Sequence, residues 1–199
     1  MPGESKTQAD RQPLRLQYLP NFLTSLRFAT APFIAWLLVV QDFRPALGVV
    51  LFAGVTDWLD GFTARRLGVT GKIGAILDPL ADKSLLVLLF LVLGAIGRIP
   101  LWMVGLAVAR DLVIITGAIL LRRLRGVRRF APSVLGKVTT FFQIILVLMV
   151  LVHAAYPDQF NGWLALAALA LSAFFTIVSG ADYIRRGLIM ARRHAPTRQ

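Results

Sequence analysis

Four aspartates lie at helical spacing within two apolar stretches of this sequence. Asp57 and Asp60 are three residues apart, and Asp78 and Asp82 are four apart. Both spacings place the two side chains of a pair on one face of a helix. A carboxylate in lipid is costly, so acids inside apolar segments usually face a cavity or a partner and indicate function. We therefore expect these four carboxylates to converge on one site.

The residue types available restrict what such a site could bind. Carboxylates this close together stay ionised only when cations neutralise them. The chain has no cysteine, two histidines and a single glutamate, Glu4, near its N-terminus. Oxygen ligands alone favour Mg²⁺ or Mn²⁺ over zinc. Four carboxylates suit a pair of such ions, which can activate an attacking oxygen and stabilise a leaving phosphate oxygen.

Small residues and one arginine surround the acids. Gly61, Ala64, Gly71 and Gly74 would allow a ligand to approach the backbone closely. Arg65, about one turn beyond Asp60, is placed to hold a phosphate. Two other interpretations stay open from the residues alone. The acids could line a cation or proton path in a transporter, or the chain could be a structural membrane adaptor.

The composition indicates the setting of this site. The 199 residues are 57% hydrophobic and 16% charged, with a mean hydropathy of +0.70. Soluble domains are usually about 45–50% apolar and about 25% charged, so a soluble globular domain is excluded as the default, as is a disordered basic tail protein. The net charge of +12 is gathered in clusters, which favours a membrane protein over a nucleic-acid-binding one.

Six apolar stretches have the length of a membrane-spanning helix. They lie near 21–40, 45–64, 76–97, 100–121, 138–156 and 162–184. We therefore predict an all-α polytopic membrane protein with one six-helix domain over 21–185. Residues 1–20 form a cytoplasmic or interfacial segment, with a possible interfacial helix, and 186–199 a basic cytoplasmic tail.

The basic residues predict the orientation. Seventeen lysines and arginines fall in segments that face the cytoplasm if the N-terminus is inside, and two, Arg44 and Arg98, fall in the outer loops. This asymmetry predicts that both termini lie inside. The aspartates then lie near the cytoplasmic surface. We expect an integral protein of a bacterial inner membrane, with its active site on the cytoplasmic side.

The run around the aspartates resembles the signature of the CDP-alcohol phosphatidyltransferase family. It reads Asp57-x₂-Asp60-Gly61-x₂-Ala64-Arg65-x₈-Gly74-x₃-Asp78-x₃-Asp82. The resemblance covers roughly residues 18–185. It implies transfer of a phosphatidyl group from CDP-diacylglycerol to an alcohol, with release of CMP. It also implies a homodimer packed through transmembrane helices.

The resemblance assigns roles to the signature residues. The four aspartates would ligate two divalent cations, Mg²⁺ or Mn²⁺, and Asp82 would also be the catalytic base for the acceptor hydroxyl. Nucleotide and diphosphate binding is assigned to the signature positions Asp57, Asp60, Gly61, Ala64, Arg65, Gly74 and Asp78.

Further segments resemble family members that make phosphatidylglycerophosphate or cardiolipin. They are Pro20–Arg27, Arg110-Asp111 and Ser133–Thr140. Arg27, Arg110, Ser133 and Lys137 are the predicted acceptor-binding residues. The alternatives are a snorkelling charge for Arg27, a structural ion pair for Arg110, and a topology-setting charge for Lys137.

Two acceptors compete. Bacterial members that use glycerol-3-phosphate usually carry Arg-Glu and a second arginine eight positions after the first, whereas this chain has Arg110-Asp111 and Ala118. Residues 41–49 look more like eukaryotic-type cardiolipin synthases, which use phosphatidylglycerol. We therefore favour phosphatidylglycerol and keep glycerol-3-phosphate as the alternative. The expected partners are CDP-diacylglycerol, this acceptor and membrane lipids, with no nucleic acid. The arginine-rich segment 122–129 is assigned to topology and anionic-lipid attraction, with direct binding of phosphatidylglycerol or CDP-diacylglycerol as the alternative.

Overall fold

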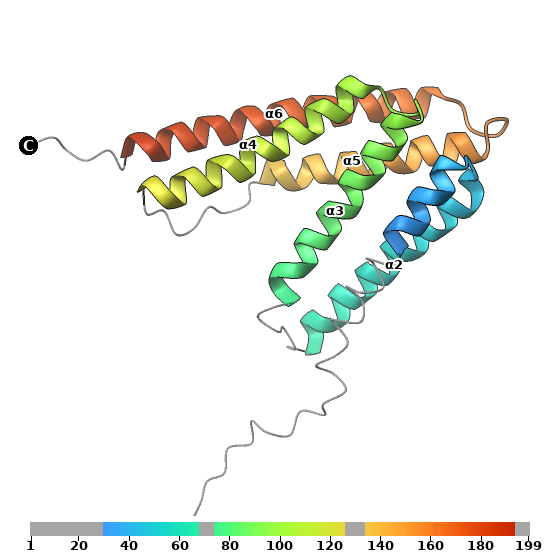
Figure 1. Ribbon diagram of the computed structural model, residues 1–199, viewed down its shortest axis with the longest axis horizontal. Coiled ribbons are helices and arrows are strands. Elements are labelled where there is room, and N and C mark those ends of the chain that lie inside the picture. The colour runs from blue at the N-terminus through green and yellow to red at the C-terminus, as the bar shows by residue number, and fades with distance from the viewer. Residues whose placement is uncertain (1–29, 68–73, 126–133, 194–199) are drawn as a thin grey trace, which may run out of the picture.

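The computed structural model describes residues 30–67, 74–125 and 134–193, which form helices joined by short turns (Figure 1). These ranges contain no strand, so the all-α prediction is confirmed for them. The helices are Thr30–Val39, α2 (Phe43–Leu67), α3 (Gly74–Ala95), α4 (Leu101–Arg125), α5 (Val134–Ala155) and α6 (Trp163–Arg193). Their positions match the six predicted stretches, and the 31-residue α6 continues past the predicted end at 184.

The helices pack in an order that differs from their order in the chain. Helix α6 packs against both α4 and α5, α2 packs along α5, and α3 contacts α4 and α5. Fully buried apolar side chains such as Leu38, Leu93, Met103, Leu146 and Leu151 form the common core. Figure 1 shows α2 and α3 diverging from α4 and α6 toward the ends that carry the aspartates.

Two tight turns make consecutive helices antiparallel neighbours. Gln41 adopts a left-handed φ of 60°, and the Asp42 N–H donates to the Leu37 carbonyl at 2.9 Å. After α3, Gly97 adopts a φ of 74°, and the Arg98 N–H donates to the Leu93 carbonyl at 2.8 Å. A left-handed residue at a helix end satisfies carbonyls that have no partner within the helix. These caps fix where each helix ends.

Two of the described helices, Val134–Ala155 and Trp163–Met190, are long and apolar enough to cross a membrane. Thr30–Val39 and the parts of α2 and α3 whose side chains the structure describes, Phe43–Thr56 and Lys83–Ala95, are shorter apolar helices. The apolar sequence of the continuous helix α4 is interrupted by Arg110-Asp111. A helix is present in each of the six predicted spans, with residues 21–29 of the first outside the described residues. The crossing of a bilayer and the orientation of the termini stay predictions.

Aromatic and cationic side chains tie together the helix ends opposite the aspartates. Arg44 Nε donates to the Ala155 carbonyl at 3.2 Å, and its guanidinium lies 5.2 Å from the centroid of the Tyr156 ring. The Arg98 guanidinium lies 4.6 Å from the centroid of the Phe43 ring. The two arginines predicted in the outer loops thus join neighbouring helix ends there.

Candidate active site

The structure places both aspartate pairs on helices. Asp57 and Asp60 lie in the second half of α2, and Asp78 and Asp82 in the first half of α3. This confirms the premise that each pair shares one helical face, since residues three and four apart are neighbours on a helix surface. The side chains at these positions lie outside the described part of the chain. Their convergence on one site therefore stays a prediction.

The rest of the signature follows the same helices. Gly61 and Arg65 continue the face of α2 that Asp57 begins, at four-residue steps, and Ala64 follows Asp60 in the same way. Gly74 is the first residue of α3. Figure 1 shows the carboxyl end of α2 near the amino end of α3, with six residues between them. The signature is therefore carried by two helix ends that a short connection keeps close.

The donor chemistry of these positions fits a hard divalent cation. Asp57, Asp60, Asp78 and Asp82 supply carboxylate oxygens, which Mg²⁺ and Mn²⁺ prefer. Among the side chains that the structure does describe, no group of three acidic, histidine or cysteine residues is placed to hold a metal. The aspartate pairs stay the predicted metal ligands because of their own donor chemistry.

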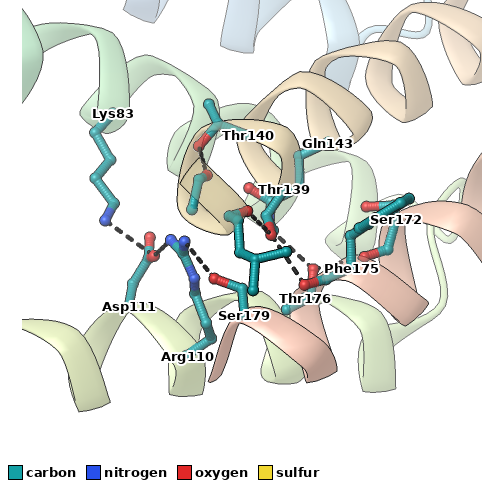
Figure 2. A network of polar contacts seen from close by, with 12 residues as sticks. Lys83, Arg110, Asp111, Thr139, Thr140, Gln143, Ser172, Phe175, Thr176 and Ser179 are labelled. Atoms are coloured by element: carbon teal, nitrogen blue, oxygen red, sulfur yellow. Dashed lines mark hydrogen bonds and ion pairs between the residues drawn. The ribbon is translucent and has the colours of Figure 1, made fainter. Parts of the chain in front are cut away.

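A cluster of three charged side chains lies beside the signature (Figure 2). Asp111 Oδ1 accepts from Lys83 Nζ at 2.9 Å and from Arg110 Nη1 at 2.8 Å. Lys83 directly follows Asp82 on α3, whereas Arg110 and Asp111 lie in the middle of α4. One carboxylate thus holds two cations and ties α3 to α4 next to the predicted base.

Arg110 is the most buried charged residue of this cluster, with 7% of its side chain exposed. Its Nη2 donates to the Ser179 hydroxyl on α6 at 3.1 Å, and its guanidinium lies 5.7 Å from the Tyr183 ring centroid. Its buried Nε has no hydrogen-bond partner among the described residues. The ion pair with Asp111, one of the two interpretations of this arginine, is therefore present, and its role in acceptor binding stays a prediction.

A cavity of about 810 Å³, partly open to the surface, lies between α2, α3, α4 and α5 next to the charged cluster. Its polar lining residues are Lys83, Arg110, Asp111, Thr140 and Gln143, and its other lining residues are apolar or glycine. This volume is typical of pockets that enclose a small-molecule ligand, which measure about 300–1,000 Å³. The cavity combines a charged end with an apolar body.

Buried hydroxyls join α5 to α6 behind the cluster. Thr139 Oγ1 lies 2.8 Å from the Leu135 carbonyl of its own helix and 2.9 Å from the Phe175 carbonyl of α6. Gln143 Nε2 donates to the Thr176 hydroxyl at 3.4 Å. Such polar contacts between apolar helices fix how one helix lies against another. Together with Ser179 they hold α6 where it meets Arg110.

The other predicted acceptor residues are not brought to the cavity by the described part of the structure. Lys137 is exposed near the start of α5 and does not line the cavity. Arg27 and Ser133 lie outside the described residues. Of the two predicted acceptor residues that the structure describes, Arg110 lines this cavity and Lys137 does not.

Comparison with known proteins decides the family. The sequence model of CDP-alcohol phosphatidyltransferases matches residues 17–178, which is most of the chain. The chain belongs to this family. It is therefore a phosphatidyltransferase by descent, and the signature helices α2 and α3 lie inside the matched region.

Curated relatives carry two different activities in their names. A CDP-diacylglycerol–glycerol-3-phosphate 3-phosphatidyltransferase of Bacillus subtilis is 34% identical over 84% of this chain and 94% of its own length. A chloroplastic enzyme of that name from rice is 33% identical over 73% of this chain and 49% of its own length. A human CMP-forming cardiolipin synthase is 31% identical over 85% of this chain and 61% of its own length.

The chain thus spans about half the length of the rice relative and 61% of the human one. The identities to the two kinds of enzyme are nearly equal, at 34% and 31% for the Bacillus and human proteins. The family of this phosphatidyltransferase is therefore shown, but similarity to these relatives does not distinguish between the two acceptors.

Sequence reasoning did not single out Lys83 or Asp111 as part of a site. The signal was available, because both are ionisable residues inside apolar helices, which is a functional indication by itself. What the sequence could not supply was the pairing, since Lys83 and Asp111 are 28 positions apart on different helices. Only the packing of α3 on α4 brings them together.

Proposed function

We propose that the protein transfers a phosphatidyl group from CDP-diacylglycerol to an alcohol acceptor and releases CMP. The observation that carries this is the helical placement of two aspartate pairs at the neighbouring ends of α2 and α3. In this proposal the four carboxylates converge on one site and supply the ligands that two divalent cations need. The family match supports the same reaction.

The chain's own residues take distinct roles in this proposal. Asp57, Asp60, Asp78 and Asp82 hold two divalent cations, Mg²⁺ or Mn²⁺, which when bound neutralise the diphosphate and stabilise the leaving oxygen of CMP. Asp82 takes the proton of the acceptor hydroxyl. The hydroxyl oxygen then forms a bond to the β-phosphorus of the donor, and the bond from that phosphorus to the bridging oxygen breaks, so the electron pair leaves with CMP.

The small residues of the signature position the donor. Gly61, Ala64 and Gly74 leave space for the cytidine and diphosphate beside the backbone of α2 and α3. Arg65, one turn past Gly61, pairs with a phosphate oxygen. Because the reactants are held in line, much of the barrier is lowered by positioning alone. The lipid tails of the donor stay in the bilayer while its nucleotide lies in water.

We propose phosphatidylglycerol as the acceptor, which makes the product cardiolipin. Support comes from Arg110-Asp111 and from Ala118, where glycerol-3-phosphate enzymes usually carry a second arginine. The human relative is a cardiolipin synthase by name. Glycerol-3-phosphate is the second candidate, favoured by the names of the Bacillus and rice relatives.

The exposed apolar side chains and the distribution of basic residues support a proposal for the membrane location, oligomeric state and orientation of the protein. We place the enzyme in a bacterial inner membrane as a homodimer, with its active site at the cytoplasmic surface. Large apolar side chains such as Leu166, Phe174 and Ile177 are exposed along α6, as expected of a helix that meets lipid or another subunit. The clustering of basic residues at the aspartate-bearing ends of the helices supports the orientation.

An acceptor screen tests the proposed function directly. The purified protein is reconstituted in liposomes with CDP-diacylglycerol, and CMP release is measured with phosphatidylglycerol, glycerol-3-phosphate or an inositol phosphate. We expect release with phosphatidylglycerol in Mg²⁺ or Mn²⁺ and none after chelation. CMP release with glycerol-3-phosphate alone would identify glycerol-3-phosphate, and not phosphatidylglycerol, as the acceptor. CMP release that is unaffected by a chelator would overturn the metal assignment.

A further inference from the structure

The cavity between α2, α3, α4 and α5 has a composition suited to a lipid. Along its body it is lined by side chains such as Val50, Leu86, Phe90, Ile144 and Val147. A sugar phosphate or another small polar alcohol would leave its hydroxyls without partners against such walls, which is costly. An acyl chain would bury apolar surface there without any such cost.

Among the side chains that the structure describes, the polar end of the cavity has two cations and one carboxylate. Among the described side chains, Lys83 and Arg110 share the single carboxylate of Asp111. Arg110 is more than nine-tenths buried, and its Nε has no hydrogen-bond partner in the described structure. Lys83 is 39% exposed, so its ammonium can exchange Asp111 for another anion. Two cations at the end of an apolar cavity favour an anionic group, and a phosphodiester is one.

The position of Lys83 in the chain indicates which substrate this anion belongs to. Lys83 directly follows Asp82, so the two residues differ by about 1.5 Å in depth along α3. Asp82 is the proposed base for the acceptor hydroxyl. The group that pairs with Lys83 therefore lies near the depth of the reacting centre, and we assign it to the acceptor because the signature aspartates and their cations already hold the donor diphosphate in the proposed function.

From these observations we infer that the cavity binds an acyl chain of a phospholipid acceptor, and that Lys83 and Arg110 pair with the phosphodiester of that lipid. The inference rests on the proposed function, and it commits the acceptor to a lipid. Asp111 acts as a positioning residue, because it holds both cations at the charged end of the cavity until the phosphodiester binds.

Filling the cavity from α2 tests the acyl-chain part. Gly54 lines the cavity, and a Cβ added there meets nothing within 4 Å. Gly48 lies on the same helix with equally open space and does not line the cavity. We therefore compare Gly54→Leu with the matched control Gly48→Leu. Initial rates are measured in mixed micelles with phosphatidylglycerol of short (dihexanoyl) or long (dioleoyl) chains, and with donor of both chain lengths.

We expect Gly54→Leu to raise the KM for long-chain phosphatidylglycerol by about tenfold, since a few carbons in an apolar pocket are worth this much. The KM for the short-chain acceptor and for CDP-diacylglycerol should change less than about twofold, as should every value for Gly48→Leu. The inference is overturned if the two variants behave alike. A shift that appears in the donor's chain-length dependence overturns it too, because the cavity then belongs to CDP-diacylglycerol.

A binding measurement tests the charged end without any turnover. Radiolabelled phosphatidylglycerol retained by the protein in detergent is measured for Lys83→Gln, for the conservative Lys83→Arg and for the unsubstituted protein. We expect retention to fall about tenfold in Lys83→Gln, in keeping with loss of a charge-assisted contact, and to recover in Lys83→Arg. Equal retention of phosphatidylglycerol by all three proteins contradicts the phosphodiester contact. So does a loss of retained uncharged diacylglycerol in Lys83→Gln that equals its loss of retained phosphatidylglycerol.

The two levels of the hypothesis fail in different ways. If the proposed function is wrong, the unsubstituted protein releases no CMP with any acceptor, whatever the retention measurement shows. If only the inference is wrong, CMP release is intact and Gly54→Leu matches Gly48→Leu. Release with glycerol-3-phosphate as the sole acceptor also overturns the inference and leaves phosphatidyl transfer standing.

Discussion

Gly94 on α3 lies so close to Val104 on α4 that a Cβ at position 94 would stand 2.7 Å from Val104 Cγ2. Val104 cannot easily turn away, since β-branched side chains are stiff and this one is buried. This contact sets how near α3 approaches α4 at the end opposite the signature. The Lys83–Asp111 ion pair joins the same two helices at the other end.

Gly94→Ala is expected to lower the stability of the α3–α4 pair. Forcing a methyl group into a well-packed contact costs about 1–3 kcal/mol, which exceeds the gain of about 1 kcal/mol in helix propensity. Gly105→Ala on α4 is the control, because a Cβ there meets nothing within 4 Å. Thermal unfolding in detergent should give a lower midpoint for Gly94→Ala than for Gly105→Ala. The reverse order would show that the contact can relax.

Asp82→Asn is expected to abolish most of the CMP release. The amide cannot take the proton of the acceptor hydroxyl, and removal of a general base lowers rates by about 10²–10⁴-fold. Asp158→Asn, in the exposed turn between α5 and α6, is the control and should retain full activity. The measurement is CMP release at saturating Mg²⁺. Full activity in Asp82→Asn would show that Asp82 is not the general base.

Thr139→Val tests the buried contact between α5 and α6. The substitution keeps the shape of the side chain and removes the hydroxyl that lies 2.9 Å from the Phe175 carbonyl. We expect a loss of about 1 kcal/mol in the free energy of unfolding, as for one hydrogen bond between apolar helices. Thr140→Val is the control, because its hydroxyl bonds within its own helix, to the Gly136 carbonyl at 3.1 Å. Equal unfolding curves for the two variants would argue against the interhelical bond.

Ser179→Ala is expected to leave a buried guanidinium N–H of Arg110 without its acceptor. An unsatisfied buried donor costs about 1–3 kcal/mol, so unfolding should shift accordingly. Ser172→Ala is a closely matched control, because Ser172 is equally buried on α6 and its hydroxyl has no hydrogen-bond partner in the described structure. A larger loss of stability in Ser172→Ala than in Ser179→Ala would contradict the role given to the Arg110 contact.

The sequence predicts the helices of this protein well because their signal is local. Continuous apolar runs of suitable length lie where α2 to α6 are found, and the spacing of Asp57 with Asp60 and of Asp78 with Asp82 already indicates one face each. The end of α6 was placed nine residues too early. Two pairs of arginines, Arg185-Arg186 and Arg192-Arg193, enclose an uncharged run there, and a helix can continue past the lipid while its basic side chains reach water.

The contacts between helices could not be predicted in the same way. Whether Lys83 faces Asp111, or Ser179 faces Arg110, depends on how each helix is rotated and on which helices are neighbours. Helices that are apolar on all sides carry little information about either, because no polar face marks the outside. The cavity was also not predictable, since its walls come from four different helices and depend on how these helices pack.

The length of α6 has a consequence for the membrane surface. Its 31 residues make a rod about 46 Å long, whereas the hydrocarbon core of a bilayer is about 30 Å thick. Tilting alone would need about 50°, beyond the usual limit of about 40°. A crossing α6 must therefore extend beyond the hydrocarbon core by at least about one turn, and Arg185 and Arg186 are exposed towards its carboxyl end. An extension at this end would hold these two cationic side chains above the hydrocarbon.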